Sequence, residues 1–472
     1  MDSKKFGKKY LAWFQSCRVL PVEWVIAGVI GGLILITYTY ADGVSWTIWS
    51  TNLLDVIFDG KPLDYYAYCR ENLFGAMHKD MGTSVFSVLP WAVWNIPIWI
   101  LQRFFGFRIV ENSLMLIWSK LFLVAALLVT AYFVYQIVLL MTGNRYRSWL
   151  AALLMVSAVH IYIAVCFAGQ NDVVICMFGV MAVYFLLKKR YGLFMLLSSF
   201  AIATKPFFIF TYIGLVLFIE KRVDKIIYRV LGGFWLTILF SLIYHNAPNY
   251  QKSIKGAIKY GDEIGKILSK DISFGPVVNT SIFILILCLV YFFAYVVKTK
   301  GDEQWRQYVL YIAMATQFVF FGFTEYFYYR LILLFPFLLC VILSNKKYLR
   351  LNMILEILLS AGAVLVHLNT NGFMGPSYVA RGFLANFLPG INTGKLHYVN
   401  LNQIMWSVKN YALYSKIFNA VFIACLILLL VINFPGFKKD LGEENDVCSR
   451  GWIWLHMALI IPVYGVSLAL CF

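Results

Sequence analysis

The sequence predicts an all-α, polytopic membrane protein that crosses the bilayer about thirteen times. Three observations lead to this prediction. The 472 residues are 61% apolar with a mean hydropathy of +0.75, and only 13% are charged, against about 25% in an ordinary soluble domain. Apolar runs close to the ~20 residues of a membrane-spanning helix recur along the chain. Basic residues gather in the short breaks between these runs.

The first apolar run, Val25–Tyr38, follows a basic leader and lacks the small-residue site at which a signal peptide is cleaved. It is therefore expected to remain as an anchor. The nine cysteines are scattered, with no CxxC pair and no histidine at metal-ligand spacing, so they are expected to be small buried residues. The sequence has no G-x-G-x-x-G or phosphate-loop motif and no stretch polar enough for a soluble nucleotide-binding domain.

The positive charge of the chain, +17, is distributed in a pattern that predicts the topology. More than half of the 40 basic residues lie in seven groups at breaks between apolar runs: Lys4, Lys5, Lys8, Lys9 and Arg18; Arg145 and Arg147; Lys188, Lys189 and Arg190; Lys221, Arg222, Lys225 and Arg229; Lys298, Lys300 and Arg306; Lys346, Lys347 and Arg350; Lys438, Lys439 and Arg450. Basic loops stay cytoplasmic, so one alternating arrangement fits every group, with the N-terminus inside and the C-terminus outside. The charge is then expected to face anionic lipid headgroups and not nucleic acid.

Three longer connections carry few basic residues and are expected on the outer side: residues 41–112, 247–275 and 370–416. The first contains Leu89–Leu101, which is rich in Trp and Ile but interrupted by Pro90 and Pro97. Counting Leu89–Leu101 as a span would invert every later loop, so we interpret it as one or two amphipathic helices lying in the outer interface.

Polar and ionisable residues at the ends of several apolar runs mark a candidate site, since such groups at membrane depth are costly and are usually functional. Those on the predicted outer side are Asp42, Gln170, Asp172, Lys205, Glu325, Tyr329 and Arg330. A shared face for residues so distant in sequence predicts one site, with carboxylates for base chemistry and cations for a phosphate. Each could instead be structural, as a solvated loop acid, a helix cap, a snorkelling lysine or an ion pair.

This ordered set resembles the GT-C superfamily of integral-membrane glycosyltransferases, in particular bacterial members that take sugars from polyprenyl-phosphate donors on the non-cytoplasmic face. The likeness consists of an acid after the first helix, a long outer loop with interfacial helices, a Gln-x-Asp turn, a Lys-Pro turn and a late Glu-Arg-Tyr-like segment. It supports a GT-C-like transmembrane module over residues 1–345, followed by C-terminal transmembrane helices over residues 346–472.

The resemblance implies a role for each matching residue. Asp42 would be the general base that activates the acceptor hydroxyl, with Asp55 in the same loop as the alternative base. Asp172, the second catalytic candidate, would line the active-site cavity together with Gln170. Lys205 would lie near the donor phosphate.

Substrate binding would also involve Glu325, Tyr329 and Arg330, although here the Glu and Arg are five residues apart where the family has them adjacent. An inverting transfer needs one carboxylate to deprotonate the acceptor, and nearby cations suffice for a phosphate leaving group. No metal ligand is assigned, and a requirement for Mg²⁺ or Mn²⁺ is left open because superfamily members differ.

The function implied is therefore transfer of a hexose or pentose from a polyprenyl-phosphate donor to a cell-envelope glycan, lipid or protein. The enzyme would lie in the plasma (inner) membrane among its lipids, with the active site on the outer face. One alternative is a flippase or other transporter of a lipid-linked saccharide, although the paired halves typical of transporters are not visible. Another is an O-antigen polymerase or ligase, which the late outer loop 370–416 keeps open.

Overall fold

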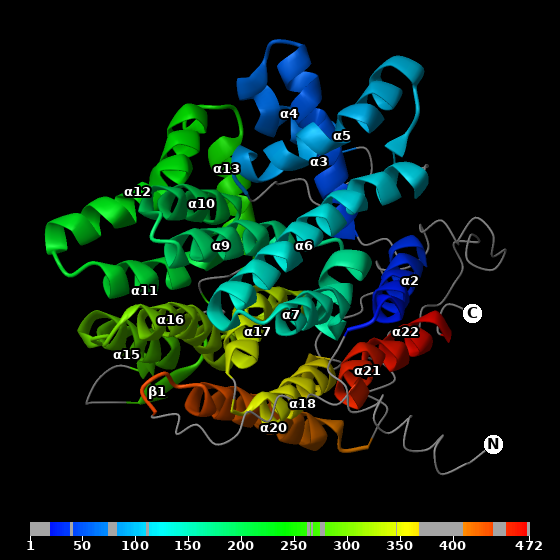
Figure 1. Cartoon of the computed structure of the whole chain (residues 1–472). Helices are drawn as coiled ribbons and strands as arrows, with labels where there is room; N and C mark the ends of the chain where they lie inside the picture. Colours follow the sequence, from blue (N-terminus) through cyan, green and yellow to red (C-terminus); the bar gives the residue numbers. More distant parts are fainter. Residues whose placement is uncertain are drawn as a thin grey trace, which may run out of the picture.

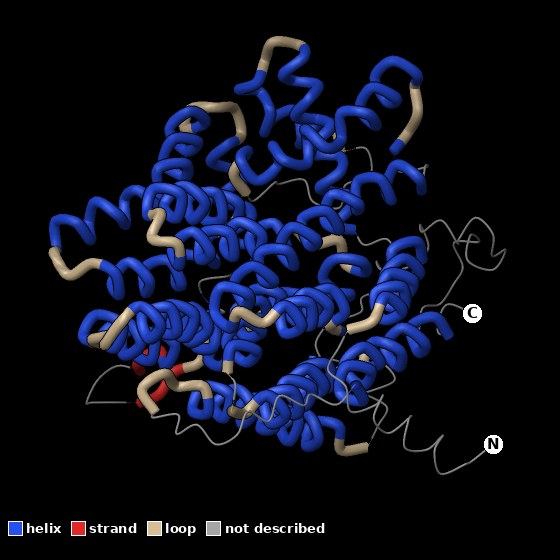
Figure 2. The backbone as a smooth tube through the Cα atoms, viewed as in Figure 1, coloured by secondary structure: helices blue, strands red, loops and turns tan. Residues whose placement is uncertain are grey.

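The computed structural model shows an almost entirely helical chain (Figures 1 and 2). It describes residues 19–37, 41–73, 83–109, 113–261, 265, 268–273, 279–345, 347–367, 409–437 and 450–469. The α-helices are α2 (Pro21–Thr37), α3 (Ala41–Phe58), α4 (Tyr65–Glu71), α5 (Val85–Phe105), α6 (Ser113–Thr142), α7 (Arg145–Ser157), α8 (Val159–Ile161), α9 (Asp172–Leu187), α10 (Tyr191–Thr204), α11 (Ile209–Ile219), α12 (Val223–Tyr244), α13 (Tyr250–Gly261), α15 (Ile282–Val296), α16 (Asp302–Phe323), α17 (Phe335–Ser344), α18 (Leu349–His367), α20 (Tyr411–Ile432), α21 (Arg450–Ala458) and α22 (Ile460–Ala469).

Short turns and one small hairpin complete the described chain. The turns are the 3₁₀ segments η1 (Pro62–Asp64), η4 (Pro206–Phe208) and η5 (Tyr328–Leu333) and the π-helical segment η3 (Tyr162–Phe167). Strands β1 (Asp271–Ser273) and β2 (Asn279–Ser281) pair antiparallel. Several sequence predictions fall outside the described residues: the basic residues from Lys4 to Arg18, Lys346, Lys438 and Lys439, and the outer loop 370–416 up to residue 408.

The structure supports an all-α membrane protein. Among the described residues, five helices are long and apolar enough to cross a membrane, or up to seven if each bent pair of helices forms one span. The five are α5, α6, α12, α18 and α20, and the bent pairs are α2 with α3 and α7 with the segment that follows it. Five further apolar helices of 10–17 residues are too short to qualify by length alone. The predicted total of about thirteen spans therefore stays a prediction.

Apolar side chains also cover the outside of the helix bundle. Along one face of α12, Leu231, Ile238 and Leu242 are 56%, 45% and 71% exposed. Their spacing of seven and four residues places them on one stripe of the helix. Soluble proteins rarely expose contiguous apolar surfaces of this kind, so this stripe is suited to contact lipid.

Residues 85–105 form one helix, α5, where one or two helices were expected at Leu89–Leu101. Ser84 caps its start by accepting a hydrogen bond from the Phe86 N–H, and Gly106 ends it at φ +71°. Pro90 and Pro97 lie inside the helix, where packing of its buried face overrides the loss of two backbone hydrogen bonds.

The segment expected to be the first part of an outer loop is also helical. α3 buries polar side chains against α5 and α6. There the Thr47 hydroxyl donates a hydrogen bond to the Ser119 hydroxyl at 2.7 Å. The Asn95 amide donates to Ser50 at 2.8 Å and to Ser119 at 3.0 Å. Because these hydroxyls and the Asn95 NH2 group hydrogen-bond to one another, polar side chains can lie in an interior where the sequence predicted a solvent-exposed loop.

Polar contacts between connecting segments fall into two groups, one at each end of the helices. At the first, named the Asp42 end, the contacts join Asp42 to Gln170, Asp172 to Lys205, Lys270 to Glu325, and Tyr411 to the Leu365 carbonyl. At the second, named the Lys189 end, they join Lys189 to Asp302, Lys221 to the Ala294 carbonyl, Arg147 to the Leu343 carbonyl, Asn345 to Asn433, and Arg450 to Glu23. This grouping is what successive helices of alternating direction produce.

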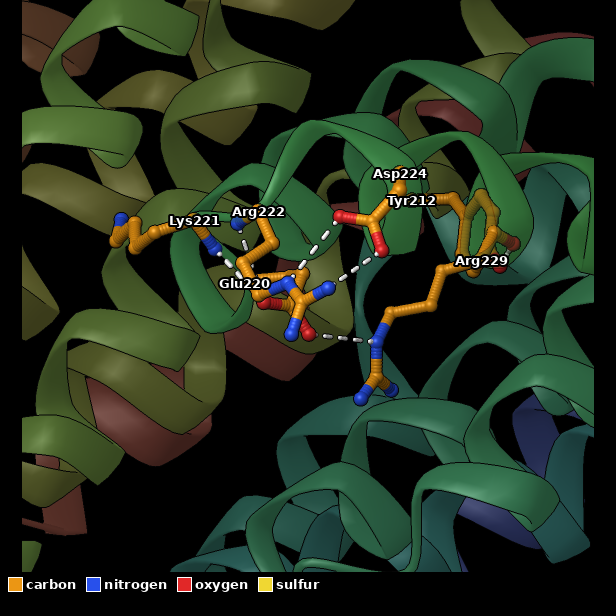
Figure 3. Close-up of polar contacts among 6 residues, drawn as sticks. All are labelled: Tyr212, Glu220, Lys221, Arg222, Asp224 and Arg229. Carbon is orange, nitrogen blue, oxygen red and sulfur yellow. Dashed lines mark hydrogen bonds and ion pairs between the residues drawn. The ribbon is translucent and has the colours of Figure 1, made fainter.

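The turn between α11 and α12 shows how charges are held at the Lys189 end (Figure 3). The Glu220 carboxylate accepts hydrogen bonds from the Lys221 and Arg222 N–H groups at 3.1 and 3.2 Å, and lies 3.5 Å from Arg229 Nε. Arg222 in turn pairs with Asp224 at 2.9 Å. These acids are used locally to fix the corner, so we assign this cluster a structural role.

Buried ion pairs attach α21, the second-last described helix, to the rest of the bundle. Arg450 Nε lies 3.0 Å from Glu23 Oε1 of α2, with exposed fractions of 1% and 0%. His456 Nδ1 lies 2.9 Å from Glu356 Oε2 of α18, and both side chains are equally enclosed. Arg450 was expected among the basic residues that face lipid headgroups, but its charge is buried against Glu23.

Candidate functional site

The candidate site is built around the turn that connects η3 to α9. η3 is a π-helical segment, a feature frequent at functional sites, and it ends two residues before Gly169. Gly169 has a φ of +60°, which favours glycine. A Cβ on Gly169 would lie 3.6 Å from the Gly43 Cα, so two glycines allow the start of α3 to approach this turn closely.

Asp42 lies at the start of α3 and contacts this turn directly. Gln170 Nε2 donates a hydrogen bond to Asp42 Oδ2 at 2.6 Å, across 128 residues of sequence. Asp42 is half-buried, whereas Gln170 is only 2% exposed. The carboxylate is thus oriented by a buried amide and still reaches the surface of the site, as a base that meets a substrate hydroxyl must.

Asp172, the first residue of α9, forms a second polar pair two residues further on. Its Oδ2 lies 2.9 Å from Lys205 Nζ. The Asp172 side chain is fully buried, while the Lys205 side chain remains 16% exposed. Asp172 Oδ1 is buried and has no hydrogen-bond partner. A carboxylate left half-satisfied in a protein interior is costly, so this pair is not explained by stability alone.

The local sequence explains why Lys205 projects from the end of its helix. The following Pro206 disfavours helical backbone at the preceding residue, and Lys205 is accordingly extended at φ −156° and ψ 144°. α10 therefore ends at Thr204. This break directs the Lys205 side chain to Asp172 at the start of the neighbouring helix.

The turn is held from its other side by tryptophans. Trp91 Nε1 of α5 donates to Asn171 Oδ1 at 2.9 Å, and its ring stacks on Trp46 of α3 at a centroid distance of 6.0 Å. Both tryptophans are buried, so they support the site and offer no stacking face to a substrate.

Arg330 and Tyr329 lie in η5, next to the Lys205 side of the site. The Arg330 guanidinium is 4.6 Å from the Phe207 ring and 5.1 Å from the Phe327 ring, and the residue is 6% exposed. Tyr329 stacks on Phe327 at 5.6 Å. Because Phe207 follows Lys205 by two residues, Arg330 packs against the segment that begins at Lys205.

Glu325 lies apart from this group. Its carboxylate forms an ion pair with Lys270 at 3.0 Å, and both side chains are more than half exposed. The expected structural or functional pairing of Glu325 with Arg330 is thus replaced by a surface contact with the segment that precedes β1. Exposed ion pairs contribute little to stability, so this contact carries no structural role, and the substrate-binding role of Glu325 stays a prediction.

Asp55, the alternative base, is also remote from Gln170. It follows Asp42 by thirteen residues in one helix, which corresponds to about 20 Å. Its carboxylate accepts hydrogen bonds from Trp99 Nε1 at 2.9 Å and the Tyr68 hydroxyl at 3.3 Å, and Arg103 lies 3.6 Å away. With its oxygens occupied, Asp55 holds α3, α4 and α5 together.

Sequence reasoning missed Lys120, which lies within the apolar helix α6. It is 4% exposed, and its ammonium donates to the Leu35 carbonyl in the last turn of α2 at 2.9 Å. The signal was present, since a lysine inside a long apolar run satisfies the same criterion that selected the other candidates.

In the described part of the chain, no group of three or more His, Cys, Asp or Glu side chains is placed to hold a metal ion. The donor set at the site therefore consists of two carboxylates, an amide and cations. No family model, curated protein or solved structure matches this chain.

Proposed function

We propose that the chain is a GT-C-type glycosyltransferase of about thirteen spans that uses a polyprenyl-phosphate-linked sugar at the Asp42 end. The observation that supports this most is the meeting of two polar pairs on one turn, Asp42 with Gln170 and Asp172 with Lys205. One pair offers a half-buried carboxylate, and the other offers a cation that reaches the surface. These are the two functions that an inverting transfer from a phosphate donor requires.

The orientation we propose places the Asp42 end outside the cytoplasm of a plasma membrane. The predicted cytoplasmic groups of basic residues contribute Lys189, Lys221 and Arg147 to contacts at the opposite, Lys189 end. Since basic loops are retained in the cytoplasm, this distribution supports an outward-facing site.

In the proposed reaction, Asp42 accepts the proton of the acceptor hydroxyl as its oxygen attacks the anomeric carbon of the donor. The bond from that carbon to the phosphate oxygen breaks, and the electron pair leaves with the polyprenyl phosphate. Lys205 and Arg330 stabilise the phosphate charge, and no general acid is needed. Gln170 orients Asp42, while Asp172 positions Lys205.

The experiment is complementation of cells lacking this chain, with envelope glycans profiled by mass spectrometry. Asp42→Asn is expected to lower the transferred sugar by about 100-fold or more, as loss of a general base does. Asp55→Asn is the matched control in the same helix, and it should restore the glycan in proportion to the amount of folded protein.

Wild-type glycan levels in both Asp42→Asn and Asp172→Asn cells would contradict the proposed transfer. A glycan still made by purified Asp42→Asn protein, with lost movement of the lipid-linked precursor across vesicles, would instead identify the chain as a transporter.

A further inference from the structure

The proposed reaction makes no use of α13, the short helix that follows α12 at the Asp42 end. α13 begins at Tyr250, six residues after α12 ends at Tyr244. Between them, Asn249 has a φ of +62°, a left-handed conformation that asparagine adopts more readily than most residues, so the chain turns there. The Asn249 carbonyl accepts a hydrogen bond from the Ser253 N–H at 2.9 Å, which starts the new helix.

One buried tyrosine of α4 fixes where α13 starts. The Tyr66 ring contacts the Tyr244 ring of α12 at a centroid distance of 5.7 Å and the Tyr250 ring of α13 at 5.1 Å, both edge to face. Tyr66 is 1% exposed, and its hydroxyl donates to the Thr83 carbonyl at 3.2 Å. Because a single ring touches both helices, α13 starts beside the end of α12 (Figure 1).

The end of α12 in turn marks the edge of the lipid-facing surface. α12 is long and apolar enough to cross a membrane, and its exposed stripe reaches the last turn at Leu242, where Ile243 is also 48% exposed. The sequence directly beyond contains His245, Asn246 and Asn249. Since exposed apolar side chains suit hydrocarbon and these polar ones do not, α13 starts near the boundary between hydrocarbon and headgroups.

α13 has one side packed against the protein and one side exposed. Ser253 is 1% exposed and Ile254 is half-buried, whereas Gln251, Lys252 and Lys255 are exposed. Lys252 and Lys255 are three residues apart, so they lie on one stripe of the helix, named here the lysine face. Among the described residues, neither of these lysines forms an ion pair with an acid. The lysine face thus presents two positive charges beside a lipid-facing helix.

We propose that the lysine face of α13 docks onto the headgroups of anionic phospholipids in the membrane leaflet at the Asp42 end. The phosphate oxygens accept hydrogen bonds from the ammonium groups of Lys252 and Lys255, and the contacts of Tyr66 hold α13 at the level of the headgroups. Each lysine near an anionic membrane surface strengthens binding about fivefold. This role is independent of sugar transfer and uses no residue of the candidate site.

The test measures hydrogen exchange of the α13 backbone in the full chain by mass spectrometry. The chain is placed in nanodiscs of phosphatidylcholine, which has no net charge, or of phosphatidylcholine mixed with anionic phosphatidylglycerol. In peptides that contain residues 250–255, exchange is expected to be about tenfold slower in the anionic nanodiscs. The reason is that α13 must leave the headgroups before it opens locally.

Three double variants identify the groups responsible, each compared with itself in the two lipids so that differences in intrinsic exchange cancel. Lys252→Gln with Lys255→Gln alters only exposed side chains, so the chain should fold and the difference between the lipids should disappear. Lys252→Arg with Lys255→Arg keeps both charges and should retain the difference. The matched control, Lys61→Gln with Lys270→Gln, removes two exposed lysines outside α13 and should also retain it.

Equal exchange of wild type in both lipids would overturn the proposal, as would slowing that persists in the variant with two glutamines. Slowing of the same size by soluble glycerol phosphate in phosphatidylcholine nanodiscs would overturn it too, since α13 would then bind a free anion and not a membrane surface. Salt at about 1 M should abolish the effect, because it screens charges beyond about 3 Å. Sugar transfer does not enter the readout, so a failure here is separate from a failure of the proposed function.

Discussion

Two sets of buried charges in this molecule differ in how completely they are satisfied. Around α21, Glu356 accepts from Ser360 on one oxygen and pairs with His456 on the other. Glu23 likewise uses one oxygen for Arg450 and the other for a backbone N–H. At the Asp42 end, by contrast, one oxygen of Asp172 has no hydrogen-bond partner.

The two sets also differ in their access to the surface. The pair of Glu23 and Arg450 is almost completely enclosed, whereas Lys205 remains 16% exposed beside a fully buried Asp172. Enclosed and complete pairs hold helices together, while an incomplete pair that reaches the surface is suited to bind something else. The difference separates residues of the same chemical type into structural and functional groups.

The largest expected effect comes from breaking an enclosed pair. Glu23→Gln leaves Arg450 charged and buried, so it should lower the free energy of unfolding by about 3–5 kcal/mol. The double variant Glu23→Gln with Arg450→Met should recover most of this loss, because no buried charge remains. Unfolding in detergent measures both effects, and glycan transfer per folded molecule should not change.

The corresponding pair at the candidate site should behave differently. Lys205→Met is expected to lower transfer by about 100-fold, because the departing phosphate loses a charge partner. Adding Asp172→Asn removes the buried carboxylate that Lys205→Met leaves without a cation. The free energy of unfolding should then recover, whereas sugar transfer should stay low. Recovery of both stability and transfer in the double variant would place this pair in the structural group.

A third group of charges, around Asp55, tests the comparison through pH. Burial raises the pKa of the Tyr68 hydroxyl to about 12, and the neighbouring Asp55 carboxylate adds to this. Because the pKa in the folded protein lies above its ordinary value of 10.0, the stabilising contribution is complete below pH 10 and is lost between pH 10 and 12. The Tm of wild type should therefore fall more between pH 10 and 12 than the Tm of Tyr68→Phe. Equal pH dependence of the two Tm values would argue against the Asp55 contact.

The smallest effect is expected at the exposed pair of Lys270 and Glu325. Glu325→Gln should change the free energy of unfolding by about 0–1 kcal/mol, since both side chains are solvated. Transfer should remain within about twofold of wild type. A loss comparable to that of Lys205→Met would show that Glu325 contacts substrate, and would restore the role that the family resemblance implies.

Much of the candidate site could be predicted from the sequence because local patterns of apolar and basic residues predict membrane topology. Basic breaks between apolar runs indicate which loops share a side, and this grouping predicted that Asp42, Asp172 and Lys205 share one face. The pairs of Asp42 with Gln170 and of Asp172 with Lys205 come from the structure alone. The Lys-Pro step likewise predicted a turn that the backbone of Lys205 confirms.

The remainder depends on contacts that no local pattern encodes. The polar residues of α3 can be buried because the Asn95 NH2 group of α5 donates to Ser50 of α3 and to Ser119 of α6, contacts that the local sequence does not predict. Glu325 pairs with Lys270 across 55 residues, and Asp55 is occupied by Trp99. In each case tertiary partners decide whether an acid belongs to a site or to the scaffold.

The pair of Glu23 and Arg450 also imposes an order on biogenesis. The first described helix enters the membrane with a carboxylate whose partner lies 427 residues further along the chain. Until α21 has been synthesised and inserted, Glu23 is an uncompensated acid in the first turn of α2. An unpaired acid of this kind is a signal by which membrane quality control recognises incompletely assembled chains. A chain that stops before Arg450 should therefore be degraded, even though it contains every residue of the candidate site.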